Sequence, residues 1–375
     1  MRYVHRQELP FRESRAERCT PLRFPDRRRG AEESSARSLQ VSPCQRKVRN
    51  NIFLSWDKSL FLPQIISMLQ AFSIKQAAAG AGFDLCGICR VRNFDAERVF
   101  FEEWLERGFD GGLGYLRRNI EKRFSPAQLM PGACSAVVCG VCYKNDTSLG
   151  YADGQAAKVA SYARSTDYHV SIKEMLYAMA SELGLKEAGV GFRAFTDSAP
   201  LLEKRLAAEA GLGFIGRNTL LVSPRYGSFL LLGELLLDAP VDVYDRPWEG
   251  VGCGECRRCV ERCPAGALTA GGLDARRCIS RLTIEPRPED VPVLRERCGA
   301  STEGWIFGCD ECQSGCPYNR TSPFFANPRF RPLFHPADVT GAQWCAMTQE
   351  EFAERFGTTP MARSGLERIK GIVGR

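Results

Sequence analysis

The residues best placed to do chemistry are cysteines gathered in two short runs. The runs CGECRRCVERCP and CDECQSGCP, with one cysteine between them, supply Cys253, Cys256, Cys259, Cys263, Cys278, Cys309, Cys312 and Cys316. The first run has the C-x2-C-x2-C-x3-C-P spacing that holds a cubane iron–sulfur cluster, and its fourth cysteine usually serves a second cluster. Three thiolates in a tight loop can reach three irons of one cube, while the proline ends the loop and favours a helix start.

This spacing predicts two [4Fe–4S] clusters whose ligands come from both runs. The first cluster takes Cys253, Cys256, Cys259 and Cys316, and the second takes Cys263, Cys278, Cys309 and Cys312. The alternatives are a zinc site or a disulfide framework. Zinc usually closes one tetrahedral site with two CxxC pairs, and seven cysteines in two compressed runs exceed that need.

Composition indicates a globular protein in a reducing compartment. The 375 residues are 44% hydrophobic and 25% charged, which leaves room for two or more domains with cores of their own. No apolar run approaches the roughly 20 residues of a membrane span, so no membrane association is expected. Clusters need free thiolates, and the 17 cysteines therefore predict a cytoplasmic location. If eight of these cysteines bind clusters, nine remain without an assigned role.

The net charge of +7 belongs to the N-terminal segment. Residues 1–50 hold 13 Lys and Arg against 6 Asp and Glu, and the rest of the chain is balanced. Residues 1–62 are read as a basic disordered arm or as an artefact of start-site choice with Met68 as the working start. A transit peptide is the third interpretation, and its usual lack of acidic residues argues against it.

The elements that must position the cysteines alternate between helices and strands. Helices are predicted at 65–80, 94–107, 170–183 and 201–210, and strands at 83–88, 136–143, 192–195 and 229–237. Two short helices are predicted in the C-terminal tail, at 349–356 and 363–372. Asp197 follows one strand and precedes a helix, so it is either an N-cap or a catalytic group at a strand end. Glu234 lies inside an apolar strand and would need a partner or a functional role.

The glycines of GLGFIG favour a close backbone approach and exclude a dinucleotide fingerprint. Gly211, Gly213 and Gly216 match G-x-G-x-x-G, but they follow a predicted helix and precede a strand, the reverse of the fingerprint's setting. Nicotinamide binding is therefore rejected. A large flat ligand approached closely by the backbone accounts better for so many glycines.

From about Met68 onward the chain resembles the epoxyqueuosine reductases, which are cobalamin and iron–sulfur enzymes of queuosine synthesis in tRNA. The motifs that carry the resemblance are EKRFSPAQLMPGA (121–133), YARSTDYH (162–169), TDSAPLLEKRLAAEAGLGFIGRNTLL (196–221), YGSFLLLGELLLD (226–238), CGECRRCVERCPAGAL (253–268), LDARRCISRLTIE (273–285) and FGCDECQSGCPYNR (307–320). The resemblance implies an α+β fold, with a reductive-dehalogenase-like α/β cobalamin-binding domain at 63–245 and a ferredoxin-like double-cluster domain at 246–322. A helical tail at 323–375 follows.

The resemblance also implies roles for single residues. Asp197 would lie over the cobalt as proton donor, with a pKa raised by burial against the corrin. Tyr168 and His169 would line the same cavity, His169 as a cobalamin contact. Further corrinoid contacts fall on Arg118, Asn218, Ser228, Ser280 and Asp310. The chain departs from the usual family pattern at Ser165, Arg281 and Tyr318, and the last two are expected near the mouth for tRNA.

The expected reaction is reduction of the epoxide of epoxyqueuosine to queuosine in a tRNA anticodon loop. Each cluster passes one electron at a time, so an external low-potential donor must deliver two in sequence. The tRNA would be held by a local basic patch, and the protein is expected to be a monomer. The alternatives are a corrinoid reductive dehalogenase-like enzyme and a two-cluster electron-transfer protein without a substrate. The latter leaves the block from Asp197 to Asp238 unexplained beyond packing.

Overall fold

The computed structural model describes residues 68–152, 154–285 and 302–373, all within the unit Pro63–Arg375. The interpretations of residues 1–62 therefore lie outside the described residues. Within the described ranges, none of the helices combines the length and the apolar character that crossing a bilayer would require.

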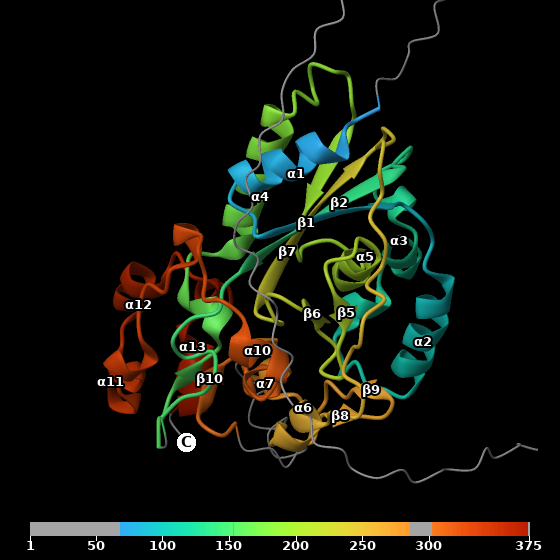
Figure 1. Cartoon of the computed structure of the whole chain (residues 1–375). Helices are drawn as coiled ribbons and strands as arrows, with labels where there is room; N and C mark the ends of the chain where they lie inside the picture. The colour runs from blue at the N-terminus through green and yellow to red at the C-terminus, as the bar shows by residue number, and fades with distance from the viewer. Residues whose placement is uncertain (1–67, 153, 286–301, 374–375) are drawn as a thin grey trace, which may run out of the picture. The chain divides into compact units, whose positions relative to one another are not determined.

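A four-stranded antiparallel sheet forms the centre of the larger half of the fold (Figure 1). Its strand order is β1 (Leu85–Arg90), β2 (Ser135–Cys142), β7 (Leu230–Leu237) and β4 (Phe192–Phe195). The inner strands β2 and β7 are apolar along nearly their whole length because helices cover both faces of the sheet. The pairings are antiparallel throughout, unlike those of a doubly wound α/β sheet.

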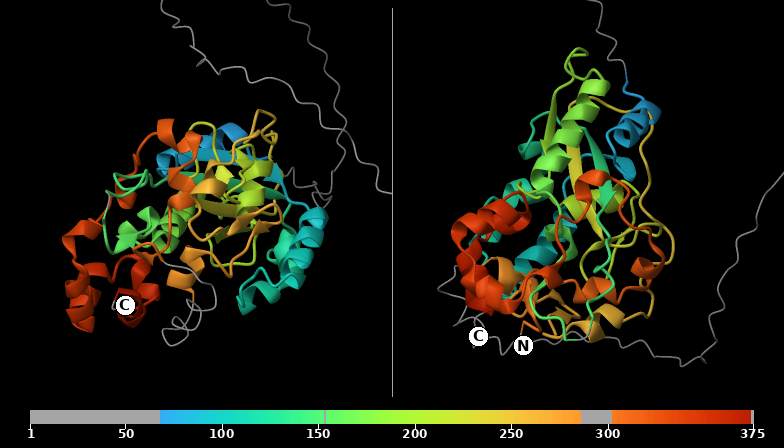
Figure 2. Two further views of the ribbon diagram at one scale, coloured as in Figure 1. Left: turned by 90° about the horizontal axis from the view of Figure 1, so that it is seen from below. Right: turned by 90° about the vertical axis from the view of Figure 1, so that its left-hand side faces the viewer.

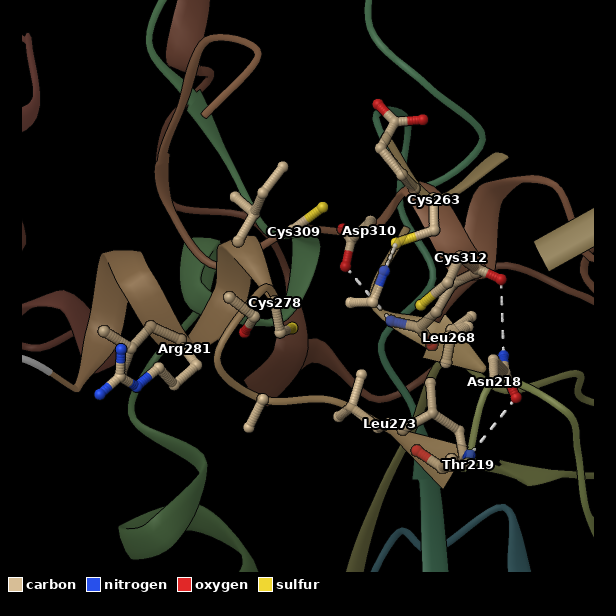
Figure 3. Close-up of a pocket in the computed structure, with 18 of the residues that line it drawn as sticks. Asn218, Thr219, Cys263, Leu268, Leu273, Cys278, Arg281, Cys309, Asp310 and Cys312 are labelled. Atoms are coloured by element: carbon tan, nitrogen blue, oxygen red, sulfur yellow. Dashed lines mark hydrogen bonds between the residues drawn. The ribbon is translucent and has the colours of Figure 1, made fainter. Parts of the chain in front are cut away.

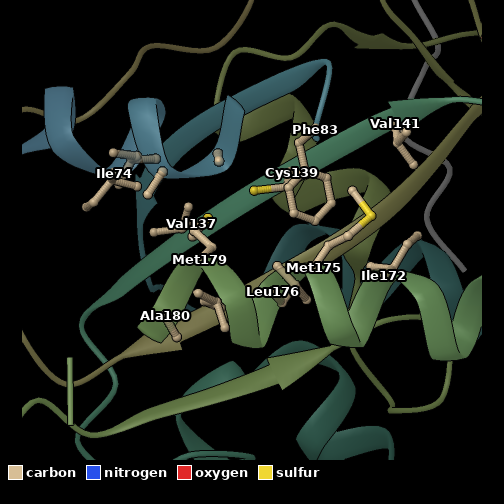
Figure 4. Close-up of a cluster of buried hydrophobic side chains, with 14 of the residues drawn as sticks. Ile74, Phe83, Val137, Cys139, Val141, Ile172, Met175, Leu176, Met179 and Ala180 are labelled. Atoms are coloured by element: carbon tan, nitrogen blue, oxygen red, sulfur yellow. The ribbon is translucent and has the colours of Figure 1, made fainter. Parts of the chain in front are cut away.

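Helices α1 (Ala71–Gly80) and α4 (Tyr168–Glu182) cover one face of this sheet. Figure 4 shows their apolar side chains, including Ile74 and Met175, meeting Val137 of β2. The next residue, Val138, points to the opposite face, as the period of two in a strand requires. There it packs in a second core with α5 (Glu203–Glu209) and the neighbouring α2 (Asp95–Glu106) and α3 (Ile120–Phe124).

The cysteine-rich region forms a layer of short elements beside the sheet. These are α6 (Arg258–Arg262), β8 (Leu268–Thr269), β9 (Gly272–Leu273), α7 (Ile279–Ile284), β10 (Trp305–Phe307), α9 (Glu311–Ser314) and α10 (Pro317–Thr321). Strand β10 pairs in parallel with β3 (Lys158–Val159), and β5 (Phe214–Ile215) pairs with β6 (Leu221–Val222). Single-turn 3-10 helices lie at Gly114–Arg117, Pro126–Gln128, Ser161–Arg164, Pro328–Phe330, Pro336–Asp338 and Pro360–Arg363.

The tail folds into three helices, which Figure 2 shows grouped in red at one side. They are α11 (Gly341–Ala346), α12 (Gln349–Phe356) and α13 (Leu366–Val373). Thr340 and Thr348 begin α11 and α12 with capping boxes, which satisfy free backbone N–H groups. Apolar residues of these helices share one core with Val159 of β3 and Phe307 of β10. The tail is therefore packed against the elements that carry the cysteines.

Candidate functional site

The cysteines predicted for the first cluster gather around one small space. Cys253, Cys256, Cys259 and Cys316 line a cavity of about 40 Å³. Cys259 lies on α6, and Cys316 immediately precedes α10, whose first residue is Pro317. The backbone N–H of Arg217 donates to the sulfur of Cys253 at 3.4 Å. Four thiols on one space fit the four ligands of a cubane cluster.

The cysteines predicted for the second cluster form part of the wall of a larger cavity of about 400 Å³. Figure 3 shows Cys263, Cys278, Cys309 and Cys312 around the same space, the last two from one short run at the start of α9. Cys278 precedes α7, and Cys312 lies on the short α9. Four thiols on this space also fit the four ligands of a cubane cluster.

A third cavity, of about 750 Å³, adjoins the 400 Å³ cavity and is lined by Asp197. Tyr143, Tyr162, Lys204 and Leu220 line both cavities, so the cavity that holds the second group of cysteines is a neighbour of the one that holds Asp197. Tyr143 and Tyr162 provide aromatic wall, with their ring centroids 6.4 Å apart.

Asp197 lies at the end of β4 in a left-handed backbone conformation, with φ of 48°. A non-glycine residue in this region is strained, and such strain is held only by the surrounding contacts. The hydroxyl of Tyr168 donates to Oδ2 of Asp197, and Nε2 of His169 lies 3.6 Å from the same oxygen. Burial raises the pKa of Asp197, but these two partners outweigh it and hold the pKa below its ordinary value. The raised pKa expected for Asp197 against a corrin stays a prediction.

His169 lies at the start of α4, where Asp167 provides the N-cap. Its Nδ1 is 2.7 Å from Oδ1 of Asp167, and the guanidinium of Arg363 approaches the ring from the tail, at 2.6 Å from Nε2. Burial lowers the pKa of His169, but the hydrogen bonds to Asp167 and Asp197 raise it more, so the net shift is upward. His169 therefore links the tail to the Asp197 loop.

The other predicted corrinoid contacts divide into two groups. Asn218, Ser280 and Asp310 line the 400 Å³ cavity, whereas Arg118 and Ser228 line neither cavity. Arg118 is exposed. Ser228 is buried, and its hydroxyl donates to Oε1 of Gln313 at 3.0 Å.

Tyr318 borders the small space of the first cysteine group, and Arg281 lines the 400 Å³ cavity. Their expected place near the mouth for tRNA stays a prediction. The glycines serve the protein's own backbone: a Cβ on Gly213 would lie 2.2 Å from the carbonyl oxygen of Val222, and one on Gly211 would lie 2.5 Å from that of Arg246. Close approach was expected, but the partner is backbone and no ligand is needed to explain it.

Sequence reasoning missed several residues of the cavity wall. Tyr115, Glu203, Arg363 and Arg368 line the 750 Å³ cavity. Glu203 stands in the motif TDSAPLLEK, six residues after Asp197, and this proximity was the available signal. Arg363 and Arg368 come from the tail, and only its folding against the cavity brings them there.

The comparisons with known proteins agree with this geometry. The family model described as epoxyqueuosine reductase QueG matches residues 123–198, and the 4Fe-4S double cluster binding domain matches residues 252–319. The epoxyqueuosine reductase of Cyclobacterium marinum is 38% identical over 299 residues, covering 79% of this chain and 92% of the relative. That of Pseudomonas aeruginosa is 37% identical over 302 residues, covering 80% and 82%.

Solved structures give the same result. An epoxyqueuosine reductase with an epoxyqueuosine-modified tRNA-Tyr stem loop matches with a TM-score of 0.68 and 26% identity over 80% of both chains. The enzyme of Bacillus subtilis, in a structure with its aspartate catalytic loop swung out of the active site, matches with a TM-score of 0.68 and 27% identity over 80% of both. The mixed α+β fold is thus confirmed, and the chain belongs to the epoxyqueuosine reductase family.

Proposed function

We propose that this chain reduces the epoxide of epoxyqueuosine in a tRNA anticodon loop, giving queuosine. The observation that carries the proposal is the pair of adjoining cavities, one lined by the second group of cysteines and the other by Asp197, in a chain of this family. A relative whose structure holds an epoxyqueuosine-modified tRNA stem loop supports the substrate. The segments 63–245, 246–322 and 323–375 would then be the cobalamin-binding domain, the double-cluster domain and the tail.

The described residues fit a bound cobalamin. The two adjoining cavities, about 400 and 750 Å³, lie within the range of small-molecule sites. Tyr143, Tyr162 and Leu220 offer apolar wall for a flat ring, and Asn218 and Ser280 offer polar groups for its amide-bearing edge. When bound, cobalamin supplies a strongly reducing metal centre for the hard step.

The residues of the chain have three tasks in this reaction. The cysteines hold clusters that accept single electrons from an external low-potential donor: Cys253, Cys256, Cys259 and Cys316 for one cluster, and Cys263, Cys278, Cys309 and Cys312 for the other. The cavity wall positions the modified base and excludes water. Asp197 donates a proton to the departing oxygen. Opening the epoxide to an alkene consumes two electrons and two protons in total, and the oxygen leaves as water.

The direct test is turnover with defined components. The anaerobically reconstituted chain, supplied with cobalamin, a low-potential reductant and an epoxyqueuosine-bearing anticodon stem loop, should yield queuosine by nucleoside mass spectrometry. Asp197→Asn should bind cobalamin normally and lose at least a hundredfold of the turnover, as expected for a general acid. Asp95→Asn, an exposed change on α2, is the matched control. Full turnover by Asp197→Asn would remove Asp197 from the mechanism, and no queuosine from the unchanged chain would reject the function.

A further inference from the structure

The mechanism above leaves one buried acid unused. Glu234 stands in the middle of β7, paired in register with Val138 of β2 and Phe195 of β4. Its side chain is 0% exposed, and both carboxyl oxygens lack a hydrogen-bond partner of ordinary geometry. An ionised carboxylate in such a place costs much free energy unless it is paired. Burial of this kind favours the neutral, protonated form of Glu234.

The group that Glu234 faces is a second carboxyl, that of Glu203 in the first turn of α5. Glu203 is partly buried, and its Oε1 accepts a hydrogen bond from the backbone N–H of Asp197. Burial, followed by the charge of Asp197, raises the pKa of Glu203 to about 7. Its own burial, followed by the charge of Glu203, also raises the pKa of Glu234. The two carboxyls are therefore neighbours, with Glu234 buried in the sheet core and Glu203 at the cavity wall.

The charges around this pair compensate it only in part, because Lys204 lowers the pKa of Glu203 but burial and the charge of Asp197 raise it more. Lys204, the next residue on α5, directs its ammonium to the carbonyl oxygen of Thr219 at 2.8 Å. His169 and Arg363 face Asp197 from α4 and the tail. Strands β1 and β2 contribute the thiols of Cys89 and Cys139, and the charge of Glu234 is among the causes that raise the pKa of each thiol.

Two carboxyls in one poorly solvated place, beside a third in Asp197, cannot all ionise near neutral pH. The pair therefore titrates as a unit and retains at least one proton.

We propose that Glu203 and Glu234 form a proton-storing carboxyl pair that resupplies Asp197 during turnover. The inference rests on the proposed function, because that reaction consumes two protons and the carboxyl of Asp197 holds one at a time. Glu203 lines the same 750 Å³ cavity as Asp197, whose side chain is 59% exposed toward it. A polar cavity of this size accommodates water able to bridge the two carboxyls.

The proposed step moves a proton and no electrons. After Asp197 has protonated the departing oxygen, the stored proton passes from Glu234 to Glu203. An O–H bond of Glu203 then breaks and an O–H bond on Asp197 forms, through a cavity water. Solvent that enters the cavity after product release restores the proton of the pair. Glu203 also holds the Asp197 loop through its hydrogen bond to the backbone, so the store lies next to the group that it supplies.

The first experiment detects the stored proton in the absence of turnover. Infrared difference spectroscopy of the cobalamin-loaded chain at pH 6 should show the carbonyl stretch of a protonated carboxyl. Glu234→Gln and Glu203→Gln should each remove or shift this band, because each replaces one member by a neutral isostere. Glu103→Gln, an exposed change on α2, should leave it unchanged. Absence of the band from the unchanged chain would overturn the proposal.

The second experiment tests whether the pair supplies protons to Asp197, by measuring kcat at several pH values. Glu234→Gln keeps a neutral hydrogen-bonding side chain but stores no proton, so kcat should fall at least tenfold above pH 7 with KM for the stem loop unchanged. The loss should be smaller at pH 6, where solvent supplies protons faster. Parallel losses of kcat at every pH in both Gln variants would indicate a structural role and overturn the proposal, as would turnover like that of the unchanged chain from pH 6 to 9. Failure of the unchanged chain to form queuosine would instead reject the proposed function, and the resupply role with it.

Discussion

At the scale of single residues, the site is a set of acids held in different protonation states. Asp197 has a lowered pKa because Tyr168 and His169 bond to it, whereas Glu203 has a pKa raised to about 7. Groups whose environments push their pKa values apart are typical of acid–base sites. Filling the cavity with a flat ligand would desolvate Asp197 and move its pKa upward, toward the value that a proton donor needs.

His169 should make the stability of the protein depend on pH. Its folded-state pKa is raised, since its bonds to Asp167 and Asp197 outweigh burial. This stabilisation is fully present below the unfolded pKa of about 6.5 and is lost as pH rises through the higher folded-state pKa. His169→Gln should therefore lower the free energy of unfolding by about 1.5 kcal/mol at pH 5.5, the order of a charge-assisted hydrogen bond, and by less at pH 9. Denaturant unfolding at the two pH values measures this.

An equal loss at both pH values in His169→Gln would mean that the imidazole acts by packing alone.

The residue types that were predictable are those whose chemistry demands a spacing. All eight cysteines could be assigned to two groups because a cubane fixes the length of the loop between its ligands. In the structure the two groups line two different cavities. Glu203 and Arg363 could not be assigned in this way. A single glutamate or arginine has many surface roles, and only tertiary packing brings these two to the cavity.

At the scale of elements, each cluster draws ligands from both cysteine runs, so the runs must fold together. Cys316 precedes α10 but lines the space of the first run, and Cys263 follows α6 but lines the cavity of the second. Cys316→Ala and Cys263→Ala should each remove about half of the bound iron, because each empties a different cubane. Iron analysis and low-temperature spectroscopy of the reduced protein measure this. Cys345→Ala, exposed on α11, should keep all of the iron. Full iron content in both ligand variants would refute the assignment.

The hairpin of β5 and β6 supports the first cysteine space and depends on a glycine. A Cβ on Gly213 would lie 2.2 Å from the carbonyl oxygen of Val222, so Gly213→Ala must displace backbone. We expect a loss of about 1–3 kcal/mol in the free energy of unfolding, the usual cost of overpacking. Gly371→Ala on α13 has open space and should be neutral or slightly stabilising. A Gly213→Ala protein as stable as the unchanged chain would show that the hairpin backbone can shift to accommodate the Cβ without loss of stability.

The long elements could be read from the sequence, and their arrangement could not. The strand predicted at 192–195 is β4, and the helix predicted at 349–356 is α12, because their periodicity and caps are local. The order β1-β2-β7-β4 joins strands that are far apart in the chain, and no local pattern states it. The two-residue strands β5 and β6 carry too few residues for any periodicity.

At the scale of the whole molecule, the tail completes the cavity. Helix α13 packs on α7 and β10, next to the cysteines, and the tail brings Arg363 and Arg368 to the cavity wall beside His169. Residues 51–375 are balanced in charge, so RNA binding must rely on such local cations and not on a uniformly basic surface. The tail must therefore pack against the cavity before the cavity wall acquires the positive charge of Arg363 and Arg368.

The tail arginines should set the salt dependence of RNA binding. If Arg363 contacts a phosphate of the single-stranded anticodon loop, Arg363→Gln should weaken stem-loop binding and reduce the slope of log K against log salt by about 0.7. Arg355→Gln, on α12 and outside the cavity wall, should leave the slope unchanged. Binding titrations at several salt concentrations measure both quantities. An unchanged slope with a lower turnover would assign Arg363 to the His169 contact alone, since that contact positions the Asp197 loop and needs no phosphate.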